Sequence, residues 1–552
     1  MSNYREKYQL WLSNVTDEKL LAELRAMDDK QIEEAFSKDL SFGTAGLRGT
    51  MTAGTDRMNI YTVYRATEGL ARYMDSKGFT KCAITYDSRN NSKLFCKIAS
   101  ATLASHGITV YLTRECMPTP YLSYMVRQLG CDMGVNVTAS HNPAAYNGYK
   151  VYDASGCQLL DDDANTVTEF IEGVQLFSQP LPDFNQYEGN LVQYTDSALE
   201  QSYINRVLQE RLQHNSIDNL KVVYTPLCGA GYRVTPATLA LAGLKDIHVV
   251  SEQAVPNGDF PTCSYPNPEM PAALEKAIAL AINVNADIVI ANDPDCDRLG
   301  VAVRNGDSFR QLSGNEVGIV LTDYVLNALS EQGKLPSNPT VVKTIVTTIM
   351  IDAIAKGYGA EVRDVLTGFK YIGNVIATLE SQGHAESYVF GFEESCGYLK
   401  GGYVRDKDGV IAALLVAEAA SHYKRKGLTL IDRLNQLSAK YGHFYQGTVS
   451  YRFEGVEGER IKNKLLGELR QKPFATLGTS AVNETCDFLT QTEYDLPKAN
   501  VLRYRSEDGS QLIVRPSGTE PLIKCYITVS GEQNALADRF ATIKAQTDKL
   551  FK

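Results

Sequence analysis

One serine and a group of aspartates are the residues of this chain best suited to chemistry. Ser140 lies in the segment Thr138–Pro143, a run of small and amide side chains, and Lys150 follows ten positions later. Three carboxylates alternate along a second segment, Asn292–Arg298. A serine can carry phosphate, and clustered carboxylates can hold a divalent cation. Together they indicate phosphoryl transfer through a phosphorylated enzyme.

The spacing of Asp293, Asp295 and Asp297 favours a hard cation. Their segment follows the apolar run 288–290, and alternate side chains share one face of an extended segment or converge in a loop. Such oxygen ligands suit Mg²⁺, whereas a calcium EF-hand would need a glycine and a glutamate that are absent here. A solvated acidic turn is the alternative, but three carboxylates at a buried strand end repel one another without a cation. The adjacent Arg298 is suited to bind a phosphate.

Ser140 alone does not identify a reaction, because a seryl hydroxyl is a poor nucleophile without a base or a metal. We expect the side chain of His141 to point away from that of its neighbour Ser140, which disfavours a hydrolase dyad. A loop serine that caps a turn stays open as an alternative.

Three further motifs could bind a phosphorylated sugar. The segment 515–519 combines a guanidinium, hydroxyls and a glycine, which suits a phosphate cradle, although such strings also form ordinary turns. Glu393 and Ser395 are acceptors for sugar hydroxyls, with a structural carboxylate as the alternative. Lys407 precedes an expected helix and could equally be a solvated surface charge.

The expected elements place these loops at strand ends. Strand and helix alternate in three successive units, and open α/β sheets bind ligands at the carboxyl ends of their strands. The expected strands are 82–86, 108–112, 132–137, 222–224, 247–250, 287–291, 341–346, 362–366 and 388–390. The expected helices between them are 93–106, 120–128, 232–242, 271–283, 348–356 and 372–380.

Both ends of the chain differ from this pattern. Residues 4–39 predict one or two polar amphipathic helices. Near the C-terminus, strand-rich stretches at 443–453 and 511–529 alternate with helices at 459–471 and 533–550. The Pro/Asn/Gly-rich stretch 256–268 predicts a loop within the second unit. We therefore expect three similar mixed-sheet α/β domains and a smaller C-terminal α+β domain. The predicted domains are 1–210, 211–318, 319–440 and 441–552.

Composition limits the partners. The 552 residues carry a net charge of −10, which argues against nonspecific nucleic-acid binding and requires a locally basic pocket for an anionic substrate. The sequence lacks an apolar run long enough to span a membrane, an N-terminal signal-peptide core and a CxxC pair. Its 11 cysteines indicate free thiols in a reducing compartment, so we expect a cytoplasmic protein.

In combination, the motifs resemble the α-D-phosphohexomutase superfamily over nearly the whole chain. The resemblance implies four domains around a central cleft, a phosphorylated Ser140, and Mg²⁺ bound by Ser140, Asp293, Asp295 and Asp297. It implies that the groups near the transferred phosphate are Arg48, Lys150 and His141. It implies that the substrate is bound by Arg298, Thr367, Gly368, Lys370, Glu393, Ser395, Arg515, Ser517, Gly518 and Thr519.

A departure at Gly397 points to one branch of this superfamily. The phosphomannomutase-type branch has a histidine there, whereas this chain resembles the branch that uses a lysine in an Arg-x-Lys-Asp-Gly string, here Lys407. Lys407 would then be the general acid/base, and as a base it would need a lowered pKa. The implied reaction interconverts glucose 1-phosphate and glucose 6-phosphate through glucose 1,6-bisphosphate, in a monomer or homodimer.

Other substrates and activities stay open. The strings Gly-Phe-Glu-Glu-Ser and Asn-Gly-Tyr-Lys-Val-Tyr also resemble the subgroup that acts on ribose or deoxyribose phosphates. Mannose and glucosamine phosphates follow as alternatives. A non-catalytic sugar-phosphate sensor and a phosphate-releasing hydrolase are rival classes.

Overall fold

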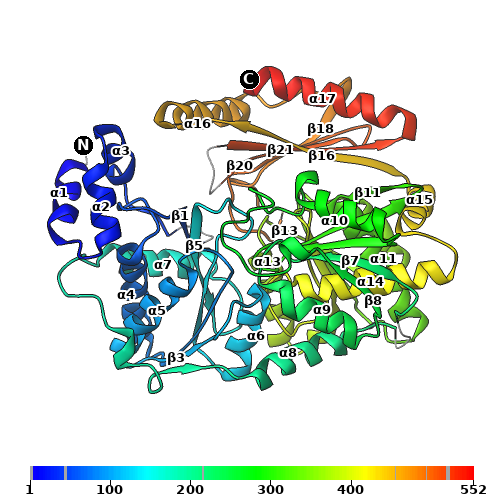
Figure 1. Ribbon diagram of the computed structural model, residues 1–552. Coiled ribbons are helices and arrows are strands. Elements are labelled where there is room, and N and C mark those ends of the chain that lie inside the picture. The colour runs from blue at the N-terminus through cyan, green and yellow to red at the C-terminus, as the bar shows by residue number, and fades with distance from the viewer. Residues whose placement is uncertain (1–3, 43–45, 214–216, 454, 493, 518–521) are drawn as a thin grey trace.

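The chain folds into four sheets with helices packed against them. The computed structural model describes residues 4–42, 46–213, 217–453, 455–492, 494–517 and 522–552. Figure 1 shows the C-terminal sheet, with α16 and α17 on its outer side, above the three α/β units. The predicted fold class is confirmed, and the sheets contain six, five, four and six strands in chain order.

The first sheet has the strand order β1-β5-β4-β2-β3-β6. Its elements are β1 (Leu47–Thr50), α4 (Ile60–Lys77), β2 (Lys81–Tyr86), α5 (Ser92–Ser105), β3 (Thr109–Leu112), α6 (Thr119–Leu129), β4 (Met133–Val137), β5 (Tyr146–Asp153), α7 (Asp161–Glu172) and β6 (Val192–Tyr194). Strand β5 returns antiparallel to β4 and pairs Lys150 with Asn136, while β1 pairs Arg48 with Gly148. This register brings both cations to the sheet edge where the serine loop leaves β4.

The N-terminal segment forms three helices rather than the one or two predicted. They are α1 (Tyr4–Asn14), α2 (Glu18–Ala26) and α3 (Asp29–Phe36). Asp17 caps α2 by accepting a hydrogen bond from the Leu20 amide, and Asp28 forms a capping box with Gln31, so the caps break the segment. Trp11 is almost fully buried and joins the N-terminal helices to α4 through its edge contact with Tyr61.

The second and third sheets are mixed. The second unit contains β7 (Lys221–Thr225), α9 (Gly231–Leu241), β8 (Asp246–Val249), α10 (Pro271–Asn283), β9 (Ile288–Asn292), β10 (Leu299–Asn305) and β11 (Ser308–Leu312), and α8 (Ser197–Gln209) precedes it. The third contains α11 (Gly314–Glu331), β12 (Thr340–Thr344), α12 (Met350–Gly357), β13 (Glu361–Val365), α13 (Phe369–Ser381), β14 (Tyr388–Glu393), β15 (Gly397–Leu399), α14 (Gly409–Arg425) and α15 (Leu430–Tyr441). Short 3₁₀ turns occur at Phe184–Gln186, Ser251–Gln253, Ala385–Ser387 and Gln533–Ala535.

Helix α14 joins these units. Nearly all of its residues are buried, and it packs against α9, α11 and β15. Its N-cap is Asp408, whose carboxylate accepts hydrogen bonds from the Val410 and Ile411 amides and from two tyrosine hydroxyls, Tyr203 and Tyr403. A buried, fully bonded cap fixes the segment that precedes it, and that segment carries Lys407.

The predicted limit between residues 318 and 319 falls inside α11. The residue that caps this helix is Ser313, which accepts a hydrogen bond from the Glu316 amide. We therefore propose that the limit between the second and third domains lies at Ser313 instead.

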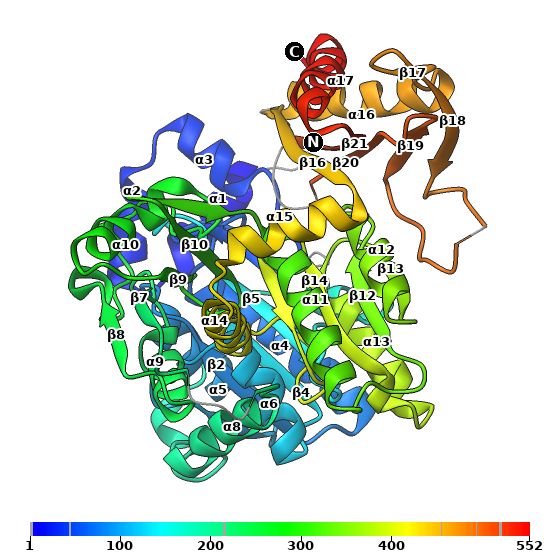
Figure 2. The same ribbon diagram turned by 90° about the vertical axis from the view of Figure 1, so that its right-hand side faces the viewer.

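The last domain is one antiparallel sheet with two helices. It contains strands outside the two strand-rich stretches that the sequence predicts. It comprises β16 (His443–Arg452), α16 (Gly455–Gln471), β17 (Thr476–Leu477), β18 (Ser480–Asp487), β19 (Leu502–Ser506), β20 (Gln511–Pro516), β21 (Leu522–Gly531) and α17 (Leu536–Phe551). The chain between β18 and β19 extends toward the third domain (Figure 2). Phe488 of this segment and Ile513 of β20 belong to one apolar cluster with Val346 and Leu366 of the third domain. The C-terminal domain is therefore docked through a hydrophobic contact.

Within the described residues, no helix combines the length and the apolar character needed to cross a membrane.

Candidate active site

A cleft of about 1670 Å³ runs between the domains, and side chains from all four line it. The predicted site residues that line it are Arg48, Ser140, His141, Lys150, Arg298, Thr367, Gly368, Lys370, Glu393, Ser395, Lys407, Arg515 and Ser517. Asp293, Asp295 and Asp297 are fully buried, and Ser140 Oγ reaches Asp293 from the cleft side. Gly518 and Thr519 lie outside the described residues.

The serine loop has an unusual backbone at Ser140. Its φ angle is +53°, in the left-handed region that a side chain rarely adopts. In this conformation Ser140 Oγ donates a hydrogen bond to Asp293 Oδ2 at 3.1 Å, and the residue is only 4% exposed. The hydroxyl thus faces the aspartate segment of the neighbouring domain.

The position of His141 corrects the sequence expectation. His141 Nδ1 lies 3.3 Å from Ser140 Oγ, because the left-handed turn at Ser140 brings the two adjacent side chains together. Burial lowers the pKa of His141 well below its ordinary value, and the Arg298 and Arg48 guanidinium groups add to this. His141 is therefore a neutral imidazole beside the hydroxyl, held edge-on against Tyr265.

Two buried residues outside the predicted motifs hold this loop. Arg89 donates hydrogen bonds to the carbonyl oxygens of Ser140, Asn142, Pro143 and Tyr146. Asp87 forms an ion pair with Arg89 at 3.1 Å and accepts a hydrogen bond from the hydroxyl of Thr138. The available signal was a polar Asp-Ser-Arg string directly after the strand predicted at 82–86.

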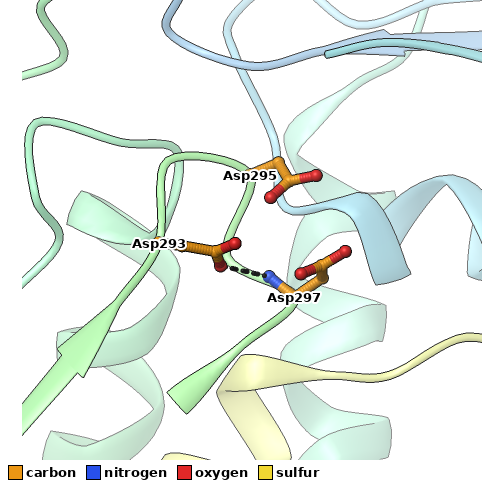
Figure 3. Close-up of side chains that lie close together, drawn as sticks. All are labelled: Asp293, Asp295 and Asp297. Carbon is orange, nitrogen blue, oxygen red and sulfur yellow. Dashed lines mark hydrogen bonds between the residues drawn. The ribbon is translucent and has the colours of Figure 1, made fainter. Parts of the chain in front are cut away.

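The three aspartates converge at the end of β9, as Figure 3 shows. One oxygen from each lies within 4.8 Å of the others. Asp293 Oδ1 accepts hydrogen bonds from the Asp297 and Arg298 amides, which bends the loop back on itself. Among the described residues, Asp295 Oδ1 and Asp297 Oδ1 have no hydrogen-bond partner although both are buried. Orphaned carboxylate oxygens at this spacing fit a divalent cation with oxygen ligands.

Two ammonium groups from other domains face these carboxylates. Lys150 Nζ lies 3.2 Å from Asp295 Oδ2, and Lys407 Nζ lies 2.9 Å from Asp297 Oδ2. Burial alone would raise the pKa of Asp295, but Lys150 and Lys407 lower it. Burial, followed by repulsion from neighbouring aspartates, raises the pKa of Asp293 and Asp297. The side chains alone thus do not favour ionisation of all three aspartates at once.

The environment of Lys407 contradicts the lowered pKa that a base would need. Burial opposes its charge, but Asp297, Asp406 and Glu393 outweigh burial and raise the pKa of Lys407 above its ordinary value. The chain therefore holds this side chain as an ammonium ion.

The predicted sugar loops meet at one point of the cleft. Glu393, at the end of β14, accepts a hydrogen bond from the Gly368 amide at 2.8 Å. Gly368 has a φ of +127°, which suits glycine, and it lets the chain turn into α13. Thr367 Oγ1 is buried without a hydrogen-bond partner among the described residues, and Ser395 also lines the cleft. These polar groups are available to a polyol.

Lys370 binds across a domain boundary. Its ammonium group lies 2.6 Å from Asp161 Oδ1, at the start of α7 in the first domain. The hydroxyl of Tyr371 donates a hydrogen bond to the other oxygen of Asp161. Lys370 lines the cleft, but in this structure its charge is paired with a carboxylate.

The C-terminal domain contributes cations to the far end of the cleft. Arg515 is close to the end of β20, Ser517 follows it, and both line the cleft. Lys524, which the sequence analysis did not select, is the cross-strand partner of Arg515 and also lines the cleft. Its position as the one charged residue in the stretch 522–529 was the available signal. The arrangement can bind an anion at a distance from Ser140.

Protein-family models and named relatives match this chain over most of its length. Models of the phosphoglucomutase/phosphomannomutase α/β/α domains I, II and III match residues 39–176, 201–306 and 313–441, and the C-terminal domain model matches 468–546. The chain is 32% identical to a protein named phosphoglucomutase from Staphylococcus aureus (strain USA300), covering 94% of this chain and 95% of that protein. A phosphoglucomutase of Staphylococcus epidermidis (strain ATCC 12228) is 34% identical, with 94% and 96% covered.

Solved structures show the same fold. The open form of the Paramecium phosphoglucomutase parafusin superimposes with a TM-score of 0.71 at 17% identity, covering 93% of this chain and 94% of that chain. A phosphoglucomutase/phosphomannomutase family protein from Burkholderia thailandensis gives 0.68 at 18% identity, with 92% and 97% covered. Four matched domain models in order, and relatives above 30% identity over nearly the full length, establish that the chain belongs to the phosphoglucomutase/phosphomannomutase family.

Proposed function

We propose that this chain is a phosphoglucomutase that interconverts glucose 1-phosphate and glucose 6-phosphate through a phosphorylated Ser140 and glucose 1,6-bisphosphate. The observation that carries the proposal is the contact of Ser140 Oγ with Asp293, 3.1 Å apart, at the floor of a cleft to which every domain contributes. The names of the Staphylococcus relatives support glucose phosphate over the pentose and mannose phosphates.

In the proposed first step, a sugar hydroxyl attacks the phosphorus of phospho-Ser140. The bond from phosphorus to the seryl oxygen breaks as the bond to the sugar oxygen forms, and the hydroxyl proton leaves. Arg48 and Lys150, which flank the serine loop, lie where they would attract the oxygens of the transferred group. Mg²⁺ held by Asp293, Asp295, Asp297 and the seryl oxygen would supply neutralisation of the charge developing on that oxygen.

Lys407 is proposed to exchange the proton with the sugar hydroxyl. As the ammonium ion that its carboxylate neighbours favour, it suits the direction in which the hydroxyl is re-formed. The opposite direction uses the deprotonated amine by microscopic reversibility.

The return step transfers the other phosphate of the bisphosphate to Ser140 after the sugar has turned over. The distal phosphate would be held by Arg515 and Ser517, together with Gly518 and Thr519. Glu393 and Ser395 would bind the sugar hydroxyls in either orientation, assisted by the Thr367–Lys370 loop and by Arg298. Separate sites for transfer, sugar and distal phosphate are what such a reorientation requires.

The test is isomerisation and intact mass measured on the same samples. Wild-type protein should convert glucose 1-phosphate to glucose 6-phosphate faster than it converts ribose, mannose or glucosamine 1-phosphate, and should carry one phosphate. Ser140→Ala should lose both phosphate and turnover while the fold remains. Ser100→Ala, which removes a buried hydroxyl without a hydrogen-bond partner among the described residues, is the matched control and should keep both.

Other outcomes identify the rivals. Robust activity of Ser140→Ala would refute the phosphoenzyme. Release of inorganic phosphate would indicate a hydrolase, binding without turnover a sensor, and a faster rate on another sugar would reassign the substrate.

Two accessory assignments accompany the proposal. All eleven cysteines lie in the described part of the chain as free thiols, which supports a reducing compartment such as the cytoplasm. The second is a monomer or homodimer, the assembly that the family resemblance implies.

A further inference from the structure

The Pro/Asn/Gly-rich stretch 256–268 lies against the anchor of the serine loop. Gly258 approaches the first domain so closely that a Cβ there would meet the Asn90 amide nitrogen at 2.3 Å. The side chain of Asn90 in turn donates a hydrogen bond to Asp259 at 2.6 Å. This stretch of the second domain is therefore in direct contact with the segment that contains Arg89.

Phe260 occupies the centre of that contact. It is only 2% exposed, and its φ of +45° is a conformation that an aromatic residue rarely adopts. The guanidinium carbon of Arg89 lies 5.0 Å from the centre of the Phe260 ring. A strained backbone is retained only where surrounding contacts determine it, so the ring is held in place against Arg89.

The terminal nitrogens of Arg89 bind the serine loop. Its side chain is fully buried, and its terminal nitrogens donate to four carbonyl oxygens between Ser140 and Tyr146, at 2.5 Å for Ser140. The Phe260 ring covers the flat face of this group, and a buried cation over an aromatic ring is stabilised by it. A second ring of the same stretch, Tyr265, packs edge-on against His141.

We propose that Phe260, acting through Arg89, is a positioning residue for the transfer step, so that the second domain fixes both the aspartates and the orientation of Ser140. The inference rests on the proposed function of Ser140. Neither Phe260 nor Arg89 touches the reacting atoms; both set the peptide geometry that points Ser140 Oγ at Asp293. A small displacement of a reacting oxygen lowers the transfer rate with little change in substrate binding.

The experiment compares Phe260→Leu with Phe309→Leu. Phe309 covers the guanidinium of Arg304 at 4.9 Å, and both residues lie in the β10–β11 hairpin, outside the residues that line the cleft. Arg304 likewise donates to backbone carbonyls, those of Ala281 and Ala286. Phe260→Leu should lower kcat about tenfold or more with KM for glucose 1-phosphate unchanged. Phe309→Leu should keep both values. Arg89→Lys, which keeps the positive charge but loses the planar guanidinium group, should reproduce the loss of kcat.

Phosphorylation of Ser140, read by intact mass in the wild type, separates the two proposals. Absence of phosphate there would refute the proposed function and this inference with it. With phosphate present, a kcat of Phe260→Leu within about twofold of Phe309→Leu, or a loss entirely in KM, would overturn the positioning role alone. If Phe260→Leu does not fold, Arg89→Lys carries the same comparison, and failure of both to fold would place the two residues in the structural core and overturn the proposal.

Discussion

At the scale of single residues, the site is defined by charges whose partners come from other domains. Asp295 and Asp297 would be unstable as a pair of buried carboxylates without Lys150 and Lys407. Arg298 adds a third cation, 3.9 Å from Asp293 and 4.0 Å from Asp297. Asp295 Oδ1 and Asp297 Oδ1 still have no hydrogen-bond partner among the described residues, which gives a divalent cation a reason to bind. The three carboxylates of the candidate metal site therefore lie on one loop, whereas the ammonium groups that pair with them come from two other domains.

Glu394 provides a test of charge burial beside the sugar loop. Burial, and then repulsion from Glu393, raises the pKa of Glu394 to about 7 from 4.5, and its carboxyl accepts a hydrogen bond from Thr344. A raised pKa means that the neutral form stabilises the fold below pH 4.5, and that this contribution is lost as pH rises through 7.

We expect the stability of the wild type, relative to Glu394→Gln, to fall by up to about 3 kcal/mol between pH 4 and pH 8. The measurement is the thermal midpoint of both proteins across that range. Parallel midpoints at every pH would contradict the assignment.

At the scale of elements, helix α13 must lie close to the segment that carries Lys407. A Cβ on Gly373 would meet the Arg405 carbonyl oxygen at 2.3 Å and Cys157 Sγ at 2.9 Å. Because the first of these atoms is backbone, an added methyl group must separate the helix from the segment.

Gly373→Ala should therefore destabilise the protein by about 1–3 kcal/mol and lower kcat, although alanine is the better helix former. Gly467→Ala in the middle of α16 is the matched control, because a Cβ there meets nothing within 4 Å. It should raise stability by about 0.5–1 kcal/mol and leave kcat unchanged. Thermal midpoints and steady-state kinetics check both, and a stabilised, fully active Gly373→Ala would show that the contact is not tight.

The elements also show what sequence patterns can and cannot predict. The helix 271–283 was predicted to the residue, since proline opens it and a polar turn follows. The sequence predicts the start of helix α14 after Lys407 but not its extent, because this helix is buried on all sides and so lacks the one-sided apolar period of a surface helix. The serine and aspartate loops were visible as local strings, whereas the contact of Arg89 with Phe260 joins residues 171 positions apart and has no local pattern.

At the scale of the whole molecule, the far end of the cleft depends on how the C-terminal domain docks. Phe488, fully buried, packs in the apolar cluster that also contains Val346 and Leu366 of the third domain. Arg515 and Ser517 are carried by the same C-terminal sheet. Weaker docking of the C-terminal domain should therefore mainly weaken binding of the distal phosphate.

We expect Phe488→Ala to raise KM for glucose 1-phosphate several-fold with a smaller change in kcat. Phe551→Ala is the control, because Phe551 is buried in the core of the same domain, against Tyr451, rather than in the contact with the third domain. Both truncations should cost about 3–5 kcal/mol of local stability. Equal KM values for the two variants would mean that docking does not set substrate affinity.

Lys150 and Lys407, which pair with the aspartates, lie on opposite sides of them in the sequence. This order has a consequence for synthesis on the ribosome. Lys150 is translated before the aspartates and Lys407 more than a hundred codons after them. A nascent polypeptide thus passes through a stage in which the acidic loop is complete but one ammonium group short. Products of premature termination before codon 407 retain that deficit permanently, and they should depend on added magnesium for compactness more strongly than the finished enzyme.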